Sequence, residues 1–387
     1  MSRLCAVGFV AYCSYAICRT PLLPLFAREL GAGPEQIGVV MAASTITGAL
    51  LKLPAGAWSD ILGRRPLLLL AAMVFAVMPF TYLAVAGLGA LIAIRFVHGS
   101  ATAIMGPVMS ATISDAAPVA RRATWLSTYS TVQGTGQAIA PIVAGALIAR
   151  GRYDLAFSIA GAIGLLVPVL VARLPMPHAA AHSAIKSTLF TEGVIEVLRE
   201  RRILVASLTH AAYYVMNGTL TAFLPLFAHD RLGLTAVEIG WLFGLQTLTT
   251  LAIRPFVGAA SDRLGRRGAI VAGLATCASG VLAIAAVRSS IEIQAAVVLY
   301  AAGVAITTAA TSAYITDVAP PARFGAAHGV FGTIYDIGDA AGPLVGGVLV
   351  AAFGYEPAFR AMAALALAAS AVFAWQSGAS AGATRPA

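Results

Sequence analysis

The stretch Gly56-Ala-Trp-Ser-Asp60-Ile-Leu-Gly63-Arg64-Arg65 recurs 202 residues later as Gly258-Ala-Ala-Ser-Asp262-Arg-Leu-Gly265-Arg266-Arg267. Other pairs keep this spacing or differ from it by one residue: Asp115 and Asp317, Pro118 and Pro320, Arg121 and Arg323, Pro141 and Pro343, and Pro24-Leu-Phe-Ala27 and Pro225-Leu-Phe-Ala228. A near-constant offset at separate places indicates that the two halves of the chain repeat each other. We therefore expect one bundle over residues 1–176, a linker over 177–202, and a second bundle over 203–387.

The composition places both bundles in a membrane. Hydrophobic residues make up 59% of the chain and charged residues 11%, whereas a soluble domain carries about 25% charged residues. A helix of about 20 apolar residues spans the hydrocarbon layer. The sequence predicts an all-α membrane protein whose twelve spans lie near residues 4–27, 36–57, 66–88, 90–113, 124–149, 154–174, 203–228, 236–258, 268–288, 291–314, 326–352 and 358–377. A short surface helix is expected near 188–200. The first run is also compatible with a signal peptide, but its tail at 24–27 has a counterpart in the second half, which favours a span.

The net charge of +9 does not indicate a nucleic-acid partner, because the basic residues form short clusters between apolar runs. Most of them fall on one side if the N-terminus is cytoplasmic, so the positive-inside rule predicts a bacterial inner-membrane protein with both termini in the cytoplasm. The four cysteines lie in apolar runs without metal-ligand spacing, and no nucleotide-binding loop or catalytic triad is evident. We expect no metal, no cofactor and no enzymatic activity, and a monomer.

The two Gly-x-x-x-Asp-x-x-Gly-Arg-Arg loops resemble the signature loop between the second and third helices of the major facilitator superfamily. The second copy carries the usual basic residue as Arg263, whereas the first has Ile61 there. The resemblance covers essentially the whole chain and implies alternating access between two six-helix bundles.

Each copy of the loop predicts a cytoplasmic gate. The first glycine allows two helices to approach closely, and the second allows a tight turn. The resemblance implies that the arginine links the loop aspartate to an acid at the inner end of the fourth helix of each half. The predicted gates are Asp60–Arg64–Asp115 with Gly56 and Gly63, and Asp262–Arg266–Asp317 with Gly258 and Gly265. Alternatively, these arginines only set the topology.

Two further stretches resemble the motif of proton-driven exporters, Gly-x-x-x-Gly-Pro-x-x-Gly-Gly. The eleventh span has Gly338-Asp-Ala-Ala-Gly342-Pro343-Leu-Val-Gly346-Gly347, and the fifth has Gly136 to Gly145 with alanine at 140 and 144. The chain thus resembles twelve-helix drug:proton antiporters. Small residues every four positions are equally expected where helices simply pack closely.

Ionisable residues inside spans are costly and indicate function. Asp336 and Asp339 lie three apart on one face of the eleventh span, and burial favours their neutral form, so either is a candidate proton carrier. Arg95, which resembles the arginine that the family links to proton transfer, and His98 on the fourth span are further proton-coupling candidates. Alternatively, the acids pair with a buried arginine, and Arg95 reaches the nearby surface.

The resemblance implies that spans one, four, seven and ten line a substrate cavity. Its candidate residues here are Arg19, Tyr12, Tyr15, His210, Tyr213, Asn217, Tyr300 and Thr307. The leading hypothesis is proton-coupled efflux of a small organic molecule by alternating access. The alternatives are uptake or facilitated transport of an anionic metabolite held by Arg19 and Arg95, a lipid-flipping transporter, and a membrane-embedded sensor.

Overall fold

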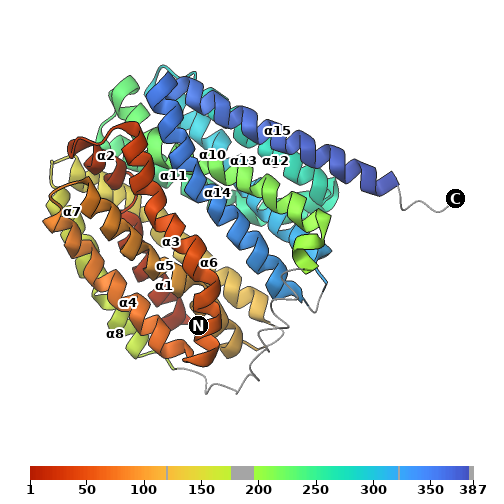
Figure 1. Ribbon diagram of the computed structural model, residues 1–387, viewed down its shortest axis with the longest axis horizontal. Coiled ribbons are helices and arrows are strands. Elements are labelled where there is room, and N and C mark those ends of the chain that lie inside the picture. The colour runs from red at the N-terminus through yellow and green to blue at the C-terminus, as the bar shows by residue number, and fades with distance from the viewer. Residues whose placement is uncertain (119–120, 176–195, 321–322, 383–387) are drawn as a thin grey trace. The chain divides into compact units, whose positions relative to one another are not determined.

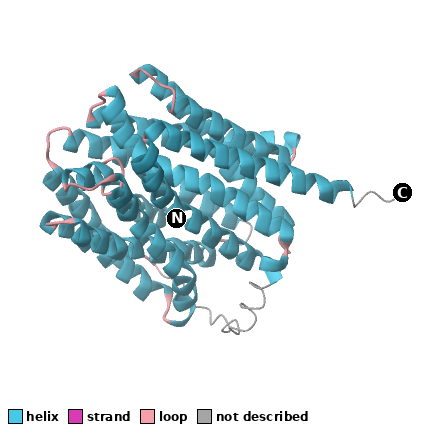
Figure 2. Cartoon of the chain, turned by 45° about the horizontal axis from the view of Figure 1, so that its top comes forward, coloured by secondary structure: helices cyan, strands magenta, loops and turns pink. Residues whose placement is uncertain are grey.

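The computed structural model describes residues 1–118, 121–175, 196–320 and 323–382. Within these ranges the chain is helical and contains no strand (Figure 2). Figure 1 follows the helices in chain order: α1 (Ser2–Ile17), α2 (Leu22–Glu29), α3 (Pro34–Ile61), α4 (Arg64–Thr81), the 3-10 turn η1 (Tyr82–Ala84), α5 (Leu88–Ala116), α6 (Arg122–Ile148), α7 (Tyr153–Gly164), α8 (Leu166–Ala172), α10 (Arg201–Leu232), α11 (Ala236–Leu264), α12 (Arg266–Ile284), α13 (Ser290–Val318), α14 (Phe324–Phe353) and α15 (Tyr355–Gly382).

These helices confirm the predicted fold class. Eleven segments of the described chain are long and apolar enough to cross a membrane, with α1 and α2 together forming the first and α7 and α8 together lying in the sixth. The helix α10 has 32 residues but is not one of these eleven, because the histidine, tyrosine, asparagine and threonine side chains in its middle lower its mean hydropathy. Its length suffices to cross a membrane, and in chain order it follows α8 and precedes α11. With α10 as the seventh span, the total is twelve.

The chain forms two compact units. The first consists of Met1–Ala184 with Thr221–Thr247, and the second of Ile185–Leu220 with Leu248–Ala387. Most of the expected linker, and with it most of the helix predicted near 188–200, lies outside the described residues. The division into bundles at 177–202 therefore stays a prediction.

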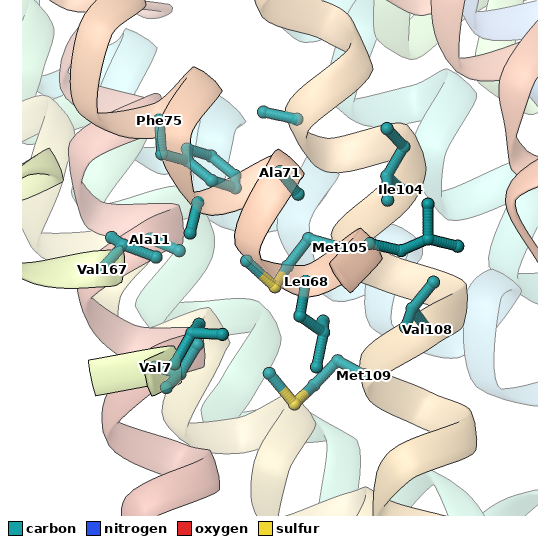
Figure 3. Packing of buried hydrophobic residues seen from close by; sticks show 14 of the residues in the cluster. Val7, Ala11, Leu68, Ala71, Phe75, Ile104, Met105, Val108, Met109 and Val167 are labelled. Carbon is teal, nitrogen blue, oxygen red and sulfur yellow. The ribbon is translucent and has the colours of Figure 1, made fainter. Parts of the chain in front are cut away.

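The first unit is built on an apolar cluster between α1, α4, α5 and α8 (Figure 3). Val7 on α1, Phe75 on α4 and Val108 on α5 are fully buried in it. Lipid tails are as apolar as these side chains, so close van der Waals packing, rather than removal from water, stabilises such contacts in a membrane. This core fixes the positions of the α1 and α5 residues that form the polar site described below.

In the second unit, helices pack almost backbone to backbone where glycines remove the side chain. A Cβ at Gly303 of α13 would lie 2.4 Å from the backbone nitrogen of Cys277 on α12. Likewise, a Cβ at Gly342 of α14 would lie 2.4 Å from the carbonyl oxygen of Val215 on α10. The glycine repeat of the eleventh span is therefore the surface on which α10 and α14 approach each other.

Two breaks distinguish the observed helices from the predicted ones. The first span was expected to be continuous, but its helix ends at Ile17 and resumes at Leu22. The sixth span is interrupted at Leu165. The break in the first span matters for function because Arg19 lies within it.

Candidate functional site

Arg19 lies in the turn between α1 and α2. The carbonyl of Ala16 accepts hydrogen bonds from the backbone N–H groups of Arg19 (3.1 Å) and Thr20 (3.4 Å), and the carbonyl of Arg19 accepts one from Leu23 (3.0 Å). Irregular backbone at membrane depth is tolerated where protein buries it or where it lines a cavity, and broken helices mark binding sites in transporters. The break thus supports Arg19 as a ligand-binding candidate. Pro21 and Pro24 were the sequence signal that could have located it.

Arg95 on α5 is fully buried, so it does not reach the surface as the alternative proposed. Its guanidinium donates hydrogen bonds to the hydroxyls of Tyr82 (3.4 Å), Tyr15 (3.5 Å) and Ser44, and its Cζ lies 5.5 Å from the centre of the Tyr15 ring. Among the described residues no carboxylate lies within 4.0 Å of it, and its partners there are hydroxyl groups. A buried charge without an opposite charge is costly, so Arg95 remains a candidate functional residue.

His98, one helical turn from Arg95, extends this network. The ring is fully buried, and its Nδ1 lies 3.1 Å from the Tyr82 hydroxyl. The Tyr82 hydroxyl also accepts a hydrogen bond from Arg95, so it bridges the guanidinium group and the imidazole ring. The Nε2 of this ring has no hydrogen-bond partner among the described residues. Arg95, Tyr82 and His98 therefore form a connected path that ends in an unused buried nitrogen.

A second polar cluster lies between α10 and α14. His210, which is 3% exposed, has its ring centre 4.9 Å from that of Phe331 and 5.2 Å from that of Tyr214. Tyr214 stacks on Tyr335 at 4.7 Å. The next residue, Asp336, is 5% exposed.

The two acids of α14 differ in their surroundings. Asp336 is buried, whereas Asp339 is partly buried. Asp336 follows Tyr335, whose ring stacks on that of Tyr214, and a Cβ at Gly218 of α10 would lie 2.7 Å from the carbonyl oxygen of Asp339. The structure therefore places the acid pair on the part of α14 that packs against α10, the seventh span.

Four other predicted cavity residues make their described contacts inside one unit each: Tyr12 in the first unit, and Asn217, Tyr300 and Thr307 in the second. Tyr12 packs against Phe75 at 6.3 Å, and Tyr300 donates a 2.9 Å hydrogen bond to Asn217. Thr307 is fully buried where a Cβ at Gly273 would come within 2.6 Å of its hydroxyl. That position favours helix packing over substrate contact.

The gate arginines contact the predicted acids at the ends of the fourth and tenth spans. Arg64 Nε lies 3.3 Å from Asp115 Oδ2, and Arg266 Nε lies 3.0 Å from Asp317 Oδ2. Arg64 also donates to the Ser59 hydroxyl. Gly63 and Gly265 have φ values of +88° and +75°, as the tight turns require.

The structure does not bear on every part of the predicted gates, and at Gly56 it differs from the prediction. The side chains of Asp60 and Asp262, and the surroundings of Gly258, lie outside the described residues. A Cβ at Gly56 would meet nothing within 4 Å in the described structure, so the expected close helix approach is not made there. The roles of both gates stay predictions.

Asp317→Asn tests the second gate. A partly exposed pair of this kind is worth up to about 1 kcal/mol, or about a fivefold change in the ratio of two conformers. We expect turnover in liposomes to change by up to about fivefold. Asp154→Asn is the matched control, because Asp154 forms an exposed pair with Arg152 (3.0 Å) away from the gates. Equal turnover in both variants and the wild type would rule out a latch.

The structure adds candidate residues that the sequence did not single out, and they are the contacts of Arg95 and His210. Ser44 on α3 and Tyr82 on η1 complete the Arg95 network, while Phe331 and Tyr335 complete the cluster around His210. Ser44 and Tyr82 lie in no predicted motif, and only the fold brings their segments to Arg95.

A polytopic helical bundle with an internal repeat and buried charges at mid-membrane is the architecture of a secondary transporter. The sequence matches the Major Facilitator Superfamily over residues 4–237 and 206–387. The chain belongs to this family.

Relatives and solved structures agree with this assignment. The chain is 25% identical over 337 residues to "Tetracycline resistance protein, class E" of Escherichia coli, covering 84% of this chain and 82% of the relative. It is 25% identical over 354 residues to "Multidrug resistance protein MdtG" of Proteus mirabilis, with coverage of 89% and 88%. Its fold is similar to that of a bacterial homolog of the human lysosomal transporter Spinster, with a TM-score of 0.83 at 17% identity, covering 96% of this chain and 95% of that structure.

Proposed function

We propose that this protein exports a small organic molecule in exchange for protons. The observation that carries the proposal is Asp336, a carboxyl group 5% exposed in the middle of a membrane-spanning helix and next to a cluster of aromatic rings. A carboxyl group in this position can hold a proton when substrate is absent and release it when the site changes access. The relatives named for tetracycline and multidrug resistance support export as the direction.

The proposal extends to orientation and partners. The clustering of arginines at one end of the spans supports cytoplasmic termini in an inner membrane. The partners are then the bilayer, protons and a small-molecule substrate, with the protein acting as a monomer that needs no cofactor.

Reconstituted protein tests the function directly. Purified full-length chain is placed in liposomes containing a pH-sensitive dye, and a panel of compounds that includes tetracycline is added with and without a pH gradient. We expect at least one compound to accumulate only with the gradient and to move protons in the opposite direction. Accumulation that survives collapse of the gradient by an ionophore would exclude proton coupling.

Arg95→Lys tests whether the hydrogen-bond network of Arg95 takes part in proton coupling. Lysine keeps the charge but lacks the planar fork that reaches Tyr82, Tyr15 and Ser44 together. We expect gradient-driven transport to fall about fivefold, with the amount of folded protein unchanged. Arg150→Lys, at an exposed position, is the control. If the two variants transport at the same rate, the hydroxyl network has no role in coupling.

Transport of an anionic metabolite is the second candidate, and Arg95 supports it as well. Its described partners are hydroxyl groups rather than a carboxylate, and Arg19 lies in the helix break of the same unit. Guanidinium groups bind anions through charge-assisted hydrogen bonds. Flux measured in inverted and right-side-out vesicles separates the two candidates, because export and uptake have opposite directions.

A further inference from the structure

A pocket lies where α10, α12, α13 and α15 meet in the second unit. Its volume is about 130 Å³, roughly ten times the ~10–15 Å³ that one water molecule needs. It is lined by Glu200, Arg201, Arg202, Val205, Arg267, Tyr314, Phe373 and Gln376. None of these residues belongs to the sites described above.

The wall of the pocket is strongly basic. Arg201, Arg202 and Arg267 face a single acid, Glu200, whose carboxylate accepts a 3.4 Å hydrogen bond from the backbone N–H of Arg202. The side chains of Arg201 and Arg202 are exposed and form no ion pair with a described residue. Guanidinium groups bind phosphate with two parallel hydrogen bonds, so this wall suits a phosphate group.

The floor of the pocket is aromatic and offers a further donor. Phe373 is 1% and Tyr314 6% exposed, and their rings pack edge to face at 5.6 Å. The Tyr314 hydroxyl donates no hydrogen bond to any residue in the described part of the chain. It is therefore available to a bound molecule.

The pocket lies at the level where lipid headgroups are found. The span on α12 begins at Arg266, the span on α13 ends four residues after Tyr314, and the span on α15 ends at Gln376. Trp375, next to the pocket, is 72% exposed, and tryptophan is enriched at the membrane interface. A molecule in the pocket would thus contact the ends of three spans.

We propose that this pocket binds the phosphate group of an anionic membrane lipid. Basic pockets between spans hold such headgroups in other membrane proteins. Arg267 follows Arg266, whose guanidinium lies 3.0 Å from Asp317. A headgroup on Arg267 therefore restrains the turn that carries the second gate, and lipid composition regulates the protein through it.

Thermal unfolding of the purified full-length chain in neutral detergent tests the proposal without a transport assay. Phosphatidylglycerol, phosphatidylcholine with the same acyl chains, and inorganic phosphate are added at equal concentration. We expect phosphatidylglycerol to raise the melting temperature by about 3 °C, and the other two to raise it by less than half as much. An equal effect of phosphatidylcholine overturns the proposal, and an equal effect of inorganic phosphate overturns the assignment to lipid.

Two variants locate the effect. Arg201→Gln with Arg202→Gln is expected to remove at least half of the shift, and Tyr314→Phe, which deletes one hydroxyl, to reduce it. Arg121→Gln with Arg122→Gln is the matched control, because these are also two adjacent exposed arginines where a helix begins, at the start of α6. A full shift in the Arg201 and Arg202 variant, or an equal loss in the control, overturns the site. Tyr314→Phe decides the outcome if the double variant does not fold.

Discussion

Asp336→Asn is expected to abolish accumulation driven by a pH gradient while leaving a folded protein. Asparagine has nearly the same shape as aspartate but cannot carry the proton. The carboxyl group lies about 15 Å along the helix from the start of its span at Ala326, so it is near the midplane. Placing a charged aspartate there costs ~2.5–3.5 kcal/mol, and the neutral variant avoids that cost. Unfolding temperature should therefore be unchanged or higher, while coupled transport is lost.

The neighbouring acid provides the comparison. Asp339 is one turn further along the same face but is only partly buried, so Asp339→Asn should keep most of the pH dependence. Downhill exchange of substrate, measured without a gradient, should persist in Asp336→Asn, because that reaction needs no proton carrier. If both variants retain full pH-dependent exchange, neither acid couples the protein to protons.

The architecture was predictable because it is encoded twice. Hydropathy alone finds eleven spans in the described chain and misses α10, whose polar residues lower its average. The apolar run over 203–228 nevertheless predicted that span, and the repeat supports it because Pro225-Leu-Phe-Ala228 is the counterpart of Pro24-Leu-Phe-Ala27. Boundaries were close: the expected 90–113 and 236–258 became Leu88–Ala116 and Ala236–Leu264.

The local details of the site were less predictable. The sequence did not predict the helix break at Arg19, because the mean hydropathy of a span is calculated over many residues and changes little when one helical turn is interrupted. The charges Arg95 and Asp336 stood out because ionisable residues are rare in spans. Their partners did not, since Ser44 and Tyr82 have ordinary side chains whose meeting with Arg95 depends on how three segments pack.

Gly342→Ala is expected to destabilise the protein more than Gly346→Ala or Gly332→Ala on the same helix, α14. The new Cβ would lie 2.4 Å from the carbonyl oxygen of Val215 and 3.0 Å from the Cα of Gly218. Both are backbone atoms of α10, so no side chain can rotate away. Overpacking typically costs about 1–3 kcal/mol, and for a chain of 387 residues the melting temperature should fall by about 1–4 °C.

The same helix supplies variants that separate packing from helix propensity. At Gly332 the nearest atom to a new Cβ is 3.8 Å away, on the Tyr335 ring, so Gly332→Ala should stabilise by the ~0.5–1 kcal/mol that alanine gains over glycine in a helix. At Gly346 the close atom, at 2.6 Å, belongs to the Thr219 side chain, which can adjust, so Gly346→Ala should fall between the two. The order of melting temperatures is the test. If Gly342→Ala melts as high as Gly332→Ala, α10 and α14 do not pack along this glycine repeat, and the motif of the eleventh span needs an explanation other than helix contact.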